Sequence, residues 1–328
     1  MSADEQSARA ALPECAQPAF DDIVNRHVLG ANNHIRMIGE MIEAIVQDGL
    51  KDGRSTGEVR RRIALVTDYF IATRGVSSQA IPNALQVMTK GLDRLADDEP
   101  LQDAAPRILG ARDSYAEMAR RAAEQVLTYA TTLLGDAKTI MAFDYSSTVE
   151  KVLQRLGGTD RTVIIPESRA ISGGAPYLAA CTAAGYRVRF VPDVALLHEL
   201  RACDAVLMGA ETFFADGTGF NTIGSDLVGL ACKELGVPLY FLTTFQKLDI
   251  RNVHGTPKTL PHLNMAQENP GFRPPGADLT TVGTTIPELI GVPAEHIRAF
   301  VTEFGVIPAS QLWEPSVRYH RELIGDHP

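Results

Sequence analysis

The feature that most constrains the fold is a change of periodicity in the middle of the chain. From about Ala19 to Leu134, apolar residues recur every three or four positions, the pattern of amphipathic helices. From Thr139 onward, short apolar runs without polar alternation alternate with helical segments, which is typical of a parallel sheet covered by helices on both faces. The sequence therefore predicts an α/β protein, with a helical N-terminal domain at residues 1–135 and a Rossmann-like parallel-sheet domain at residues 136–328.

The helices of the first domain have recognisable ends. One helix is predicted to start at an N-cap offered by Ser55 or Thr56, with Glu58 in its first turn, and to stop at Gly75. Further helices are predicted at residues 20–50, 81–97 and 113–135.

Composition and charge narrow the class of partner. Of 328 residues, 45% are apolar and 22% charged, which suits a globular chain with a full core. A formal charge of -9 and the lack of a basic run argue against a nucleic-acid backbone as partner. A pocket for one small phosphate stays compatible with this charge, since it needs only one or two cations and some backbone N–H groups.

The cysteines and the N-terminal segment favour a cytoplasmic protein. Cys15, Cys181, Cys203 and Cys232 are widely spaced, without a C-x-x-C pair or a zinc-type His pattern, and are predicted to be small buried residues. No basic segment precedes an apolar run at the N-terminus, and no run approaches membrane-spanning length, so no membrane partner is expected.

The loops that leave the strands are the predicted site. In open parallel sheets these loops line the ligand crevice at the carboxyl ends of the strands. The segments that should converge there follow Phe143, Pro166, Pro192, Ala210 and Thr244.

In the first two of these loops, polar side chains could bind an anion or could have an ordinary structural role. Ser146 and Ser147 precede a helix, where they would suit a bound anion or serve as an ordinary N-cap. Arg169 could grip a phosphate with two N–H groups, or pair with Glu167 on a solvated loop.

The next loops are richer in polar residues. The segment "GAETFFADGTGFNTIGS" is predicted to be a glycine-rich loop whose backbone could approach a ligand. It carries Asp216, Thr218, Asn221 and Thr222, and the segment "TTFQKLDIR" brings Lys247. No Walker, G-x-G-x-x-G, zinc or nucleophile-elbow spacing is present, so neither a cofactor nor a metal nor a nucleophilic triad is predicted.

The order of these loops along the chain and their amino-acid sequences resemble those of one family. "GAETFFADGTGFNTIGSDLVGLACKELGVPLYFLTTFQKLD", "PESRAISGGAPYLAACTAAGYRVRFVPDVAL" and "MAFDYSSTVEKVLQRL" are similar to three blocks of the regulatory subunits of translation initiation factor 2B. The same family includes methylthioribose-1-phosphate isomerase and ribose-1,5-bisphosphate isomerase. The resemblance extends from about Val28 to Asp249.

The resemblance implies a helical domain followed by a Rossmann-like domain, assembled as a homodimer or a higher homo-oligomer. It also implies a sugar-phosphate pocket at the strand ends. The isomerases of the family convert a phosphorylated aldose into a ketose with a Cys after the first strand and an Asp in the glycine-rich loop.

Four positions depart from the family pattern. The family Cys falls on Asp144 and the family Asp on Thr218, while a family Lys becomes Thr222 and a family Arg becomes Leu29. The loss of two cations favours a singly phosphorylated or differently substituted sugar over a bisphosphate.

Other positions of the family pocket are retained. They imply substrate-binding roles for Glu167, Arg169, Gly209, Asn221 and Lys247, and for Ser77 and Ser78, which match a Val-Ser-Ser of the factor 2B alpha subunits. Substrate-binding roles are also predicted for Arg74, Ser146, Ser147 and Thr222.

Two functions follow from these residues and the resemblance. In the first, the chain is a divergent aldose–ketose isomerase in which Asp144 is the base, and Asp216 or a water held by Thr218 handles the second proton. In the second, it is a non-catalytic subunit that binds a sugar phosphate or nucleotide.

Overall fold

The chain forms two compact units in a computed structural model. One unit comprises residues 1–120 with 321–328, and the other comprises residues 121–320. The structure describes residues 2–28, 30–76, 78–274 and 276–325. The change from helices to strands falls after Leu133, whereas the division between the units falls within the preceding helix. The predicted domain boundary between residues 135 and 136 stays a prediction.

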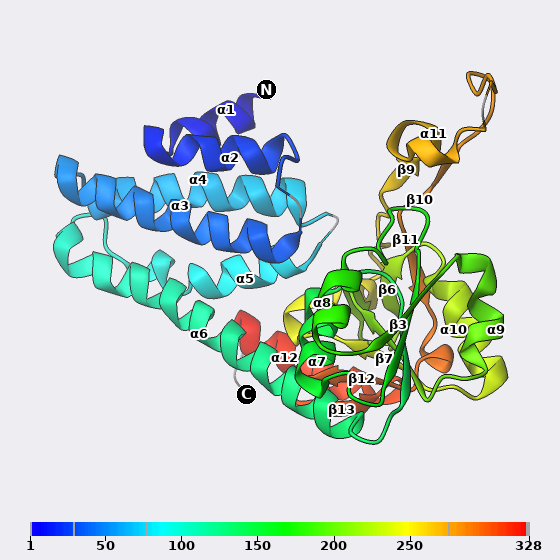
Figure 1. Cartoon of the computed structure of the whole chain (residues 1–328). Helices are drawn as coiled ribbons and strands as arrows, with labels where there is room; N and C mark the ends of the chain where they lie inside the picture. Colours follow the sequence, from blue (N-terminus) through cyan, green and yellow to red (C-terminus); the bar gives the residue numbers. More distant parts are fainter. Residues whose placement is uncertain (1, 29, 77, 275, 326–328) are drawn as a thin grey trace. The chain divides into compact units, whose positions relative to one another are not determined.

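The first unit is helical, as the periodicity predicts. Ser55 caps its fourth helix by accepting a hydrogen bond from the backbone N–H of Glu58, and Gly75 is the C-cap of that helix. The helix predicted over residues 81–97 is wrong in length, because it ends at Met88 and Gly91 then adopts a left-handed φ of +80°. The helices are α1 (Ala3–Ala10), α2 (Gln17–Val24), α3 (Ala31–Asp52), α4 (Thr56–Arg74), α5 (Ala80–Met88) and α6 (Leu101–Leu133) (Figure 1).

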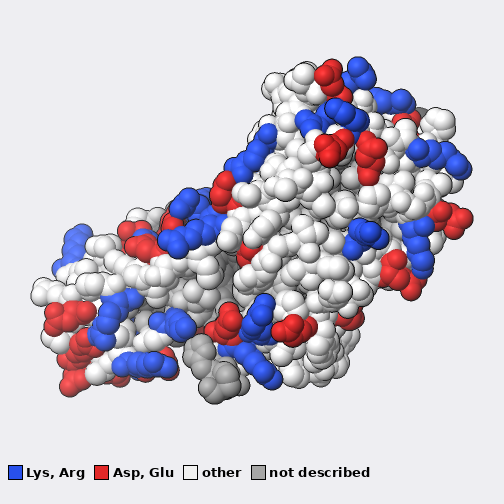
Figure 2. Space-filling model, turned by 90° about the horizontal axis from the view of Figure 1, so that it is seen from below, with Lys and Arg blue, Asp and Glu red and all other residues white. Residues whose placement is uncertain are grey.

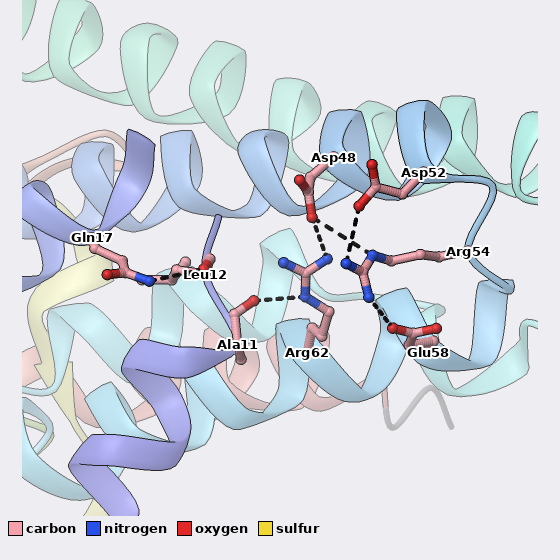
Figure 3. Close-up of polar contacts among 8 residues, drawn as sticks. All are labelled: Ala11, Leu12, Gln17, Asp48, Asp52, Arg54, Glu58 and Arg62. Carbon is pink, nitrogen blue, oxygen red and sulfur yellow. Dashed lines mark hydrogen bonds and ion pairs between the residues drawn. The ribbon is translucent and has the colours of Figure 1, made fainter. Parts of the chain in front are cut away.

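A charged network crosses the helices of this unit (Figure 3). Arg62 of α4 donates to the carbonyl of Ala11 at 2.7 Å and to the carboxylate of Asp48 on α3 at 2.7 Å. Arg54, in the loop between α3 and α4, pairs with Asp52 at 3.0 Å and with Glu58. Because Arg62 is largely buried, its two partners offset the cost of removing its charge from water.

The second unit is built on a seven-stranded sheet. Its strand order is β13-β12-β7-β4-β1-β2-β3, parallel throughout except for the antiparallel edge strand β13. The chain runs outward from β1 through β2 to β3 and then returns to β4 on the other side of β1. The strands are β1 (Thr139–Ala142), β2 (Thr162–Pro166), β3 (Arg187–Val191), β4 (Ala205–Gly209), β7 (Leu239–Leu242), β12 (Ala299–Thr302) and β13 (Gly305–Pro308).

Both faces of this sheet are covered. Alternate residues of β1 show this, because Met141 and Phe143 join one apolar core while Ile140 and Ala142 join another. The first core includes buried residues of α9 and α10, and the second includes those of α7, α8 and the end of α6 (Figure 1). The helices are α7 (Ser147–Leu156), α8 (Tyr177–Ala183), α9 (Leu196–Leu200), α10 (Ser225–Leu235) and α12 (Trp313–Ile324).

The segment predicted as a glycine-rich loop after β4 is a β-hairpin. Its strands pair antiparallel, with Thr212 opposite Phe220, and they belong to a second sheet of order β11-β6-β5-β8. Gly219 is needed for packing rather than for a loop, because a Cβ there would lie 2.9 Å from the ring of Phe241. These strands are β5 (Thr212–Phe214), β6 (Gly219–Thr222), β8 (Leu248–Asp249) and β11 (Leu289–Val292).

A small excursion completes the unit. Strands β9 (His262–Asn264) and β10 (Thr285–Pro287) pair with each other, and α11 (Met265–Glu268) lies between them in sequence. They extend away from the seven-stranded sheet (Figure 1).

The surface is mixed in charge on the face that Figure 2 presents. Lys and Arg residues are interspersed there with Asp and Glu residues, and no continuous basic band covers the described part of that face. Within the residues that the structure describes, no helix is long and apolar enough to cross a membrane.

Candidate functional site

The site is centred on Asp144, which follows β1 where the strand order reverses. Phe143 still pairs with the sheet by donating its N–H to the carbonyl of Leu207 at 3.2 Å. Asp144 then turns the chain with a left-handed φ of +58°, a conformation that Asp adopts more readily than most residues. Ligands of open α/β sheets bind at such a switch point.

The hydroxyl of Tyr177, the first residue of α8, makes hydrogen bonds on both sides of this turn. Its hydroxyl donates to the carbonyl of Asp144 at 2.8 Å and accepts the N–H of Ser146 at 2.8 Å. Tyr177 is fully buried, and these two bonds tie the backbone on both sides of Tyr145 to its hydroxyl. The residue supports the site without facing a ligand.

The carboxyl group of Asp144 lies between two hydroxyls and is only 5% exposed. Ser168 Oγ donates to Oδ1 at 3.2 Å, and Thr222 Oγ1 donates to Oδ2 at 2.8 Å. Burial raises the pKa of Asp144 above its ordinary value, and the two hydroxyl donors offset part of that rise. The arrangement yields an oriented carboxyl group that gains a proton more readily than a surface Asp.

The loop after β2 is tied to the loop after β3. The carboxylate of Asp193 accepts the backbone N–H of Ser168 at 2.9 Å and that of Arg169 at 2.8 Å. Ser168 and Ser172 both have left-handed φ values, +48° and +56°. Ser168 and Asp144, which contact each other, both have this uncommon conformation, and such strain is commonly found at functional sites.

Gly173 closes the remaining side of Asp144. A Cβ built on Gly173 would overlap Asp144 Oδ1 and would lie 3.3 Å from Ser168 Oγ. The Gly-Gly pair noted in the sequence therefore allows a loop to pack directly against the carboxyl group.

Gly173→Ala is expected to displace that carboxyl group and to lower any activity that depends on it by about 10²-fold, because a shift near 1 Å can cost that much. Overpacking should also cost about 1–3 kcal/mol of unfolding free energy. Steady-state kinetics and denaturant titrations measure the two effects. Gly283→Ala is the matched control, since a Cβ there meets no atom within 4 Å. Equal activity in the two variants would contradict the prediction.

The residues at the ends of β1 and β4 approach closely. Ser146 accepts the N–H of Val149 at 3.5 Å as the N-cap of α7, the ordinary of its two interpretations. Gly209 is required beside it, because a Cβ there would lie 2.5 Å from Ser146 Oγ. Ser147 is the first residue of α7.

Two of the predicted anion-binding cations are bonded to other groups of the protein. Arg169 pairs with Glu167 at 3.4 Å and donates to the carbonyl of Gly271 at 2.9 Å. Lys247 Nζ donates to the carbonyl of Ala210 at 2.6 Å, beside the end of β4.

The residues predicted on the hairpin separate into three groups. Thr222 contacts Asp144, as described above. Asn221 is 7% exposed, and its Nδ2 has no partner within the described chain. Asp216 and Thr218 lie in the turn between β5 and β6, where the Asp216 carboxylate accepts the Thr218 N–H at 2.8 Å. The described residues show no hydrogen bond from either of them to Asp144.

The predicted residues of the helical domain belong to the other unit. Arg74 donates to the carbonyls of Ile23 and Val24 at 2.6 and 3.0 Å. Ser78 is buried, and its Oγ has no partner within the described chain. Ser77 and Leu29 lie outside the described residues.

Sequence reasoning missed Tyr177 and Asp193. Tyr177 lies within an apolar helix pattern, where nothing marks its hydroxyl as a support for the loop that follows β1. Asp193 directly follows β3, so its place at a strand end was a usable signal.

Comparison with known proteins places these features in a family. The sequence model of the Initiation factor 2 subunit family matches residues 30–309. A relative from Pyrococcus furiosus, named ribose 1,5-bisphosphate isomerase, is 25% identical over 295 residues, which cover 88% of this chain and 89% of the relative.

The solved structures agree in fold. The structure of 5-methylthioribose 1-phosphate isomerase from Pyrococcus horikoshii matches with a TM-score of 0.74 at 17% identity, covering 96% of this chain and 88% of its own. The delta subunit of translation initiation factor eIF-2B from A. fulgidus matches with a TM-score of 0.65 at 20% identity, covering 97% and 95%.

Proposed function

The chain belongs to the Initiation factor 2 subunit family, and on that premise we propose that it is an aldose–ketose isomerase acting on a phosphorylated pentose or a related sugar. One observation carries the proposal: the buried carboxyl group of Asp144 lies at the switch point of the sheet, oriented by Ser168 and Thr222. Relatives named ribose 1,5-bisphosphate isomerase match most of the chain, which supports this substrate class.

The reaction moves two hydrogens and needs no external oxidant. When a cyclic sugar 1-phosphate becomes an open 2-ketose 1-phosphate, the bond between C1 and the ring oxygen breaks. The hydrogen on C2 moves to C1, and the C2 hydroxyl proton ends on the ring oxygen. C2 is oxidised to a carbonyl while C1 is reduced by the same amount. The protein must therefore position the sugar and exchange protons with it.

Asp144 is the group proposed to exchange the proton at C2. Ser168 and Thr222 hold the carboxyl group in one orientation, which is the requirement for an efficient general base. Its raised pKa brings it nearer to neutral pH, where a group can both accept and return a proton.

The second proton is assigned to Asp216 or to a water held by Thr218. Thr218 and Thr222 are four residues apart at one side of the hairpin, about 13 Å along an extended strand. The C2 hydroxyl is one bond from C2, so at this separation from Asp144 its proton must reach Asp216 or Thr218 through bridging waters.

Anion binding is assigned to the first N–H groups of a helix and to two cations that donate to backbone carbonyls. Ser146 and Ser147 open α7, whose first N–H groups suit a phosphate oxygen. Arg169 and Lys247 donate to carbonyl groups that a phosphate could replace. Glu167, Gly209 and Asn221 complete the proposed binding set of this unit, and the substrate-binding roles predicted for Arg74, Ser77 and Ser78 of the helical unit stay predictions.

The test is conversion of defined sugars followed by proton and phosphorus NMR in deuterated buffer. Ribose 1,5-bisphosphate, methylthioribose 1-phosphate, ribose 1-phosphate and 5-deoxyribose 1-phosphate are the substrates. We expect a ketose signal from at least one of them, with deuterium at C1 if the hydrogen moves as a proton. Retention of protium at C1 would overturn Asp144 as the base at carbon, and no ketose from any of them would overturn the isomerase assignment.

A second function is favoured by one observation. Both carboxyl oxygens of Asp144 already accept hydroxyl groups of the protein, so the site is satisfied without a substrate. A non-catalytic subunit that binds a sugar phosphate or nucleotide would have such a site. In the same NMR experiment it would broaden the ligand lines without conversion.

The proposal includes self-association. We propose a homodimer or a larger homo-oligomer, because family members named in solved structures include the subunits of a tetrameric complex.

A further inference from the structure

A cation that the sequence analysis did not single out lies over a ring of β6, the strand that also makes the Asp144 contact. Phe220 and Thr222 are two residues apart on β6, so their side chains leave the same face of that strand. Lys258 Nζ lies 5.4 Å from the centroid of the Phe220 ring. Thr222 on that face donates to Asp144 at 2.8 Å.

Lys258 is held in place without being fully enclosed. It follows the short helical turn η5 (Arg251–His254) and is half-buried, with its ammonium on an aromatic face. Burial lowers the pKa of Lys258, while the nearby carboxylates of Asp249 and Glu211 raise it. A partly desolvated cation of this kind interacts more strongly with an anion than a solvated one.

The buried carboxylate near Lys258 already has a stronger partner. Arg251 donates to the two oxygens of Asp249 at 2.8 and 2.7 Å, a bidentate pair. Asp249 is 1% exposed, and its charge is balanced by that guanidinium. Asp249 therefore has a second cation, Arg251, besides Lys258.

The same face also offers a polar group without a protein partner. Thr212 of β5 lies directly opposite Phe220, so the two side chains share one face. Thr212 Oγ1 is buried and has no hydrogen-bond partner within the described chain. A hydroxyl donor and a cation thus flank one aromatic ring.

We propose that Lys258 binds the phosphate of a sugar that occupies this face of the second sheet with its C2 toward Asp144. The inference rests on the proposed function and names a binding residue for it. Phe220 and Thr222 are about 7 Å apart along the strand, a span that a sugar phosphate can bridge between an anion site and a proton-exchanging carboxyl group. The family pattern that the chain resembles has a Lys at the position of Thr222, and Lys258 is proposed to supply that charge from another segment.

Three variants test the proposal. Lys258→Met removes the charge and keeps much of the apolar stem, and Lys258→Arg keeps the charge. Lys151→Met is the matched control, because Lys151 is an exposed lysine on α7 of the same unit. Dissociation constants for ribose 1,5-bisphosphate, ribose 1-phosphate and unphosphorylated ribose are measured by titration calorimetry with the whole chain.

Lys258→Met is expected to weaken binding of the phosphorylated sugars by about tenfold to hundredfold, the usual effect of one charge-assisted hydrogen bond. Lys258→Arg should retain most of the affinity, and Lys151→Met should match the natural chain. Ribose binding should not depend on residue 258. Unchanged phosphate affinity in Lys258→Met would overturn the proposal, and so would equal losses in Lys258→Met and Lys151→Met.

The outcomes separate this inference from the isomerase proposal. Conversion with full activity in Lys258→Met would overturn the role of Lys258 and leave the isomerase intact. Binding that depends on Lys258 without conversion would support the role of Lys258 and overturn the isomerase. Absence of saturable binding of either phosphate to the natural chain would overturn both.

Discussion

Replacing Asp144 with Asn is expected to lower isomerase turnover by about 10²- to 10⁴-fold, the usual contribution of a positioned general base. Asn has the same shape, tolerates the left-handed φ of +58°, and can still accept one of the two hydroxyl hydrogen bonds. It cannot take up a proton at neutral pH. Turnover is followed by phosphorus NMR on the sugar that the natural chain converts.

A control is available within the same unit. Asp160 also has a left-handed φ, +60°, but it is an exposed turn residue, so Asp160→Asn repeats the chemical change outside the site. We expect Asp160→Asn to keep full turnover. Comparable turnover in Asp144→Asn and the natural chain would exclude Asp144 as the base.

The stability of the Asp144→Asn variant distinguishes loss of chemistry from loss of fold. The pKa of Asp144 is raised in the folded state, so the folded state binds its proton more tightly than the unfolded chain. The stability associated with this group is present at low pH and is lost as the pH rises through the raised pKa. At neutral pH the variant should therefore unfold no more easily than the natural chain.

The seven-stranded sheet was predictable because its central strands are buried on both faces. Apolar runs such as residues 139–143 and 162–166 leave no polar face, and the structure confirms both as strands of the mainly parallel sheet. Strand-end loops converge by the geometry of such sheets. That rule is why Asp144 and Thr222, 78 residues apart in sequence, could be expected in one site.

The hairpin after β4 was not predictable from composition. Its glycines suggested a loop, whereas Gly219 leaves room for the ring of Phe241 from the neighbouring sheet. The side chain that fills the space is in another segment, so the pattern of one segment cannot reveal the reason for the glycine. The same limit applies to Lys258, which gains its place from Phe220 nearly forty residues earlier.

The supporting residues were missed for a related reason. Tyr177 acts through one hydroxyl on a buried ring, and its helix would look the same with Phe at that position. Glu303 lies between β12 and β13, outside the strand-end loops predicted to form the site. Its carboxyl group accepts the N–H of Phe245 at 3.1 and 3.0 Å, at the start of the short helical turn η4 (Phe245–Lys247) that carries Lys247.

Glu303→Gln is expected to stabilise the protein at pH 8 and to have little effect at pH 5. Burial raises the pKa of Glu303 from 4.5 to about 7, although the bond from Phe245 opposes the rise. The folded state therefore holds a proton that the unfolded chain releases, and this stability is lost as the pH rises from the unfolded value through about 7. At pH 8 the unfolding free energy of Glu303→Gln should exceed that of the natural chain by an amount on the order of 2–3 kcal/mol.

The neutral amide removes this cost because its oxygen can still accept the Phe245 N–H while no charge is buried. Denaturant titrations at pH 5 and pH 8 measure the effect, and Glu314→Gln on the exposed face of α12 is the control. A gain of the same size at both pH values would mean that packing, and not ionisation, separates the variants. If the gain in unfolding free energy appears only at pH 8, ionisation of Glu303 is its cause. The natural chain then retains a destabilising buried carboxylate where a neutral amide would support the same turn.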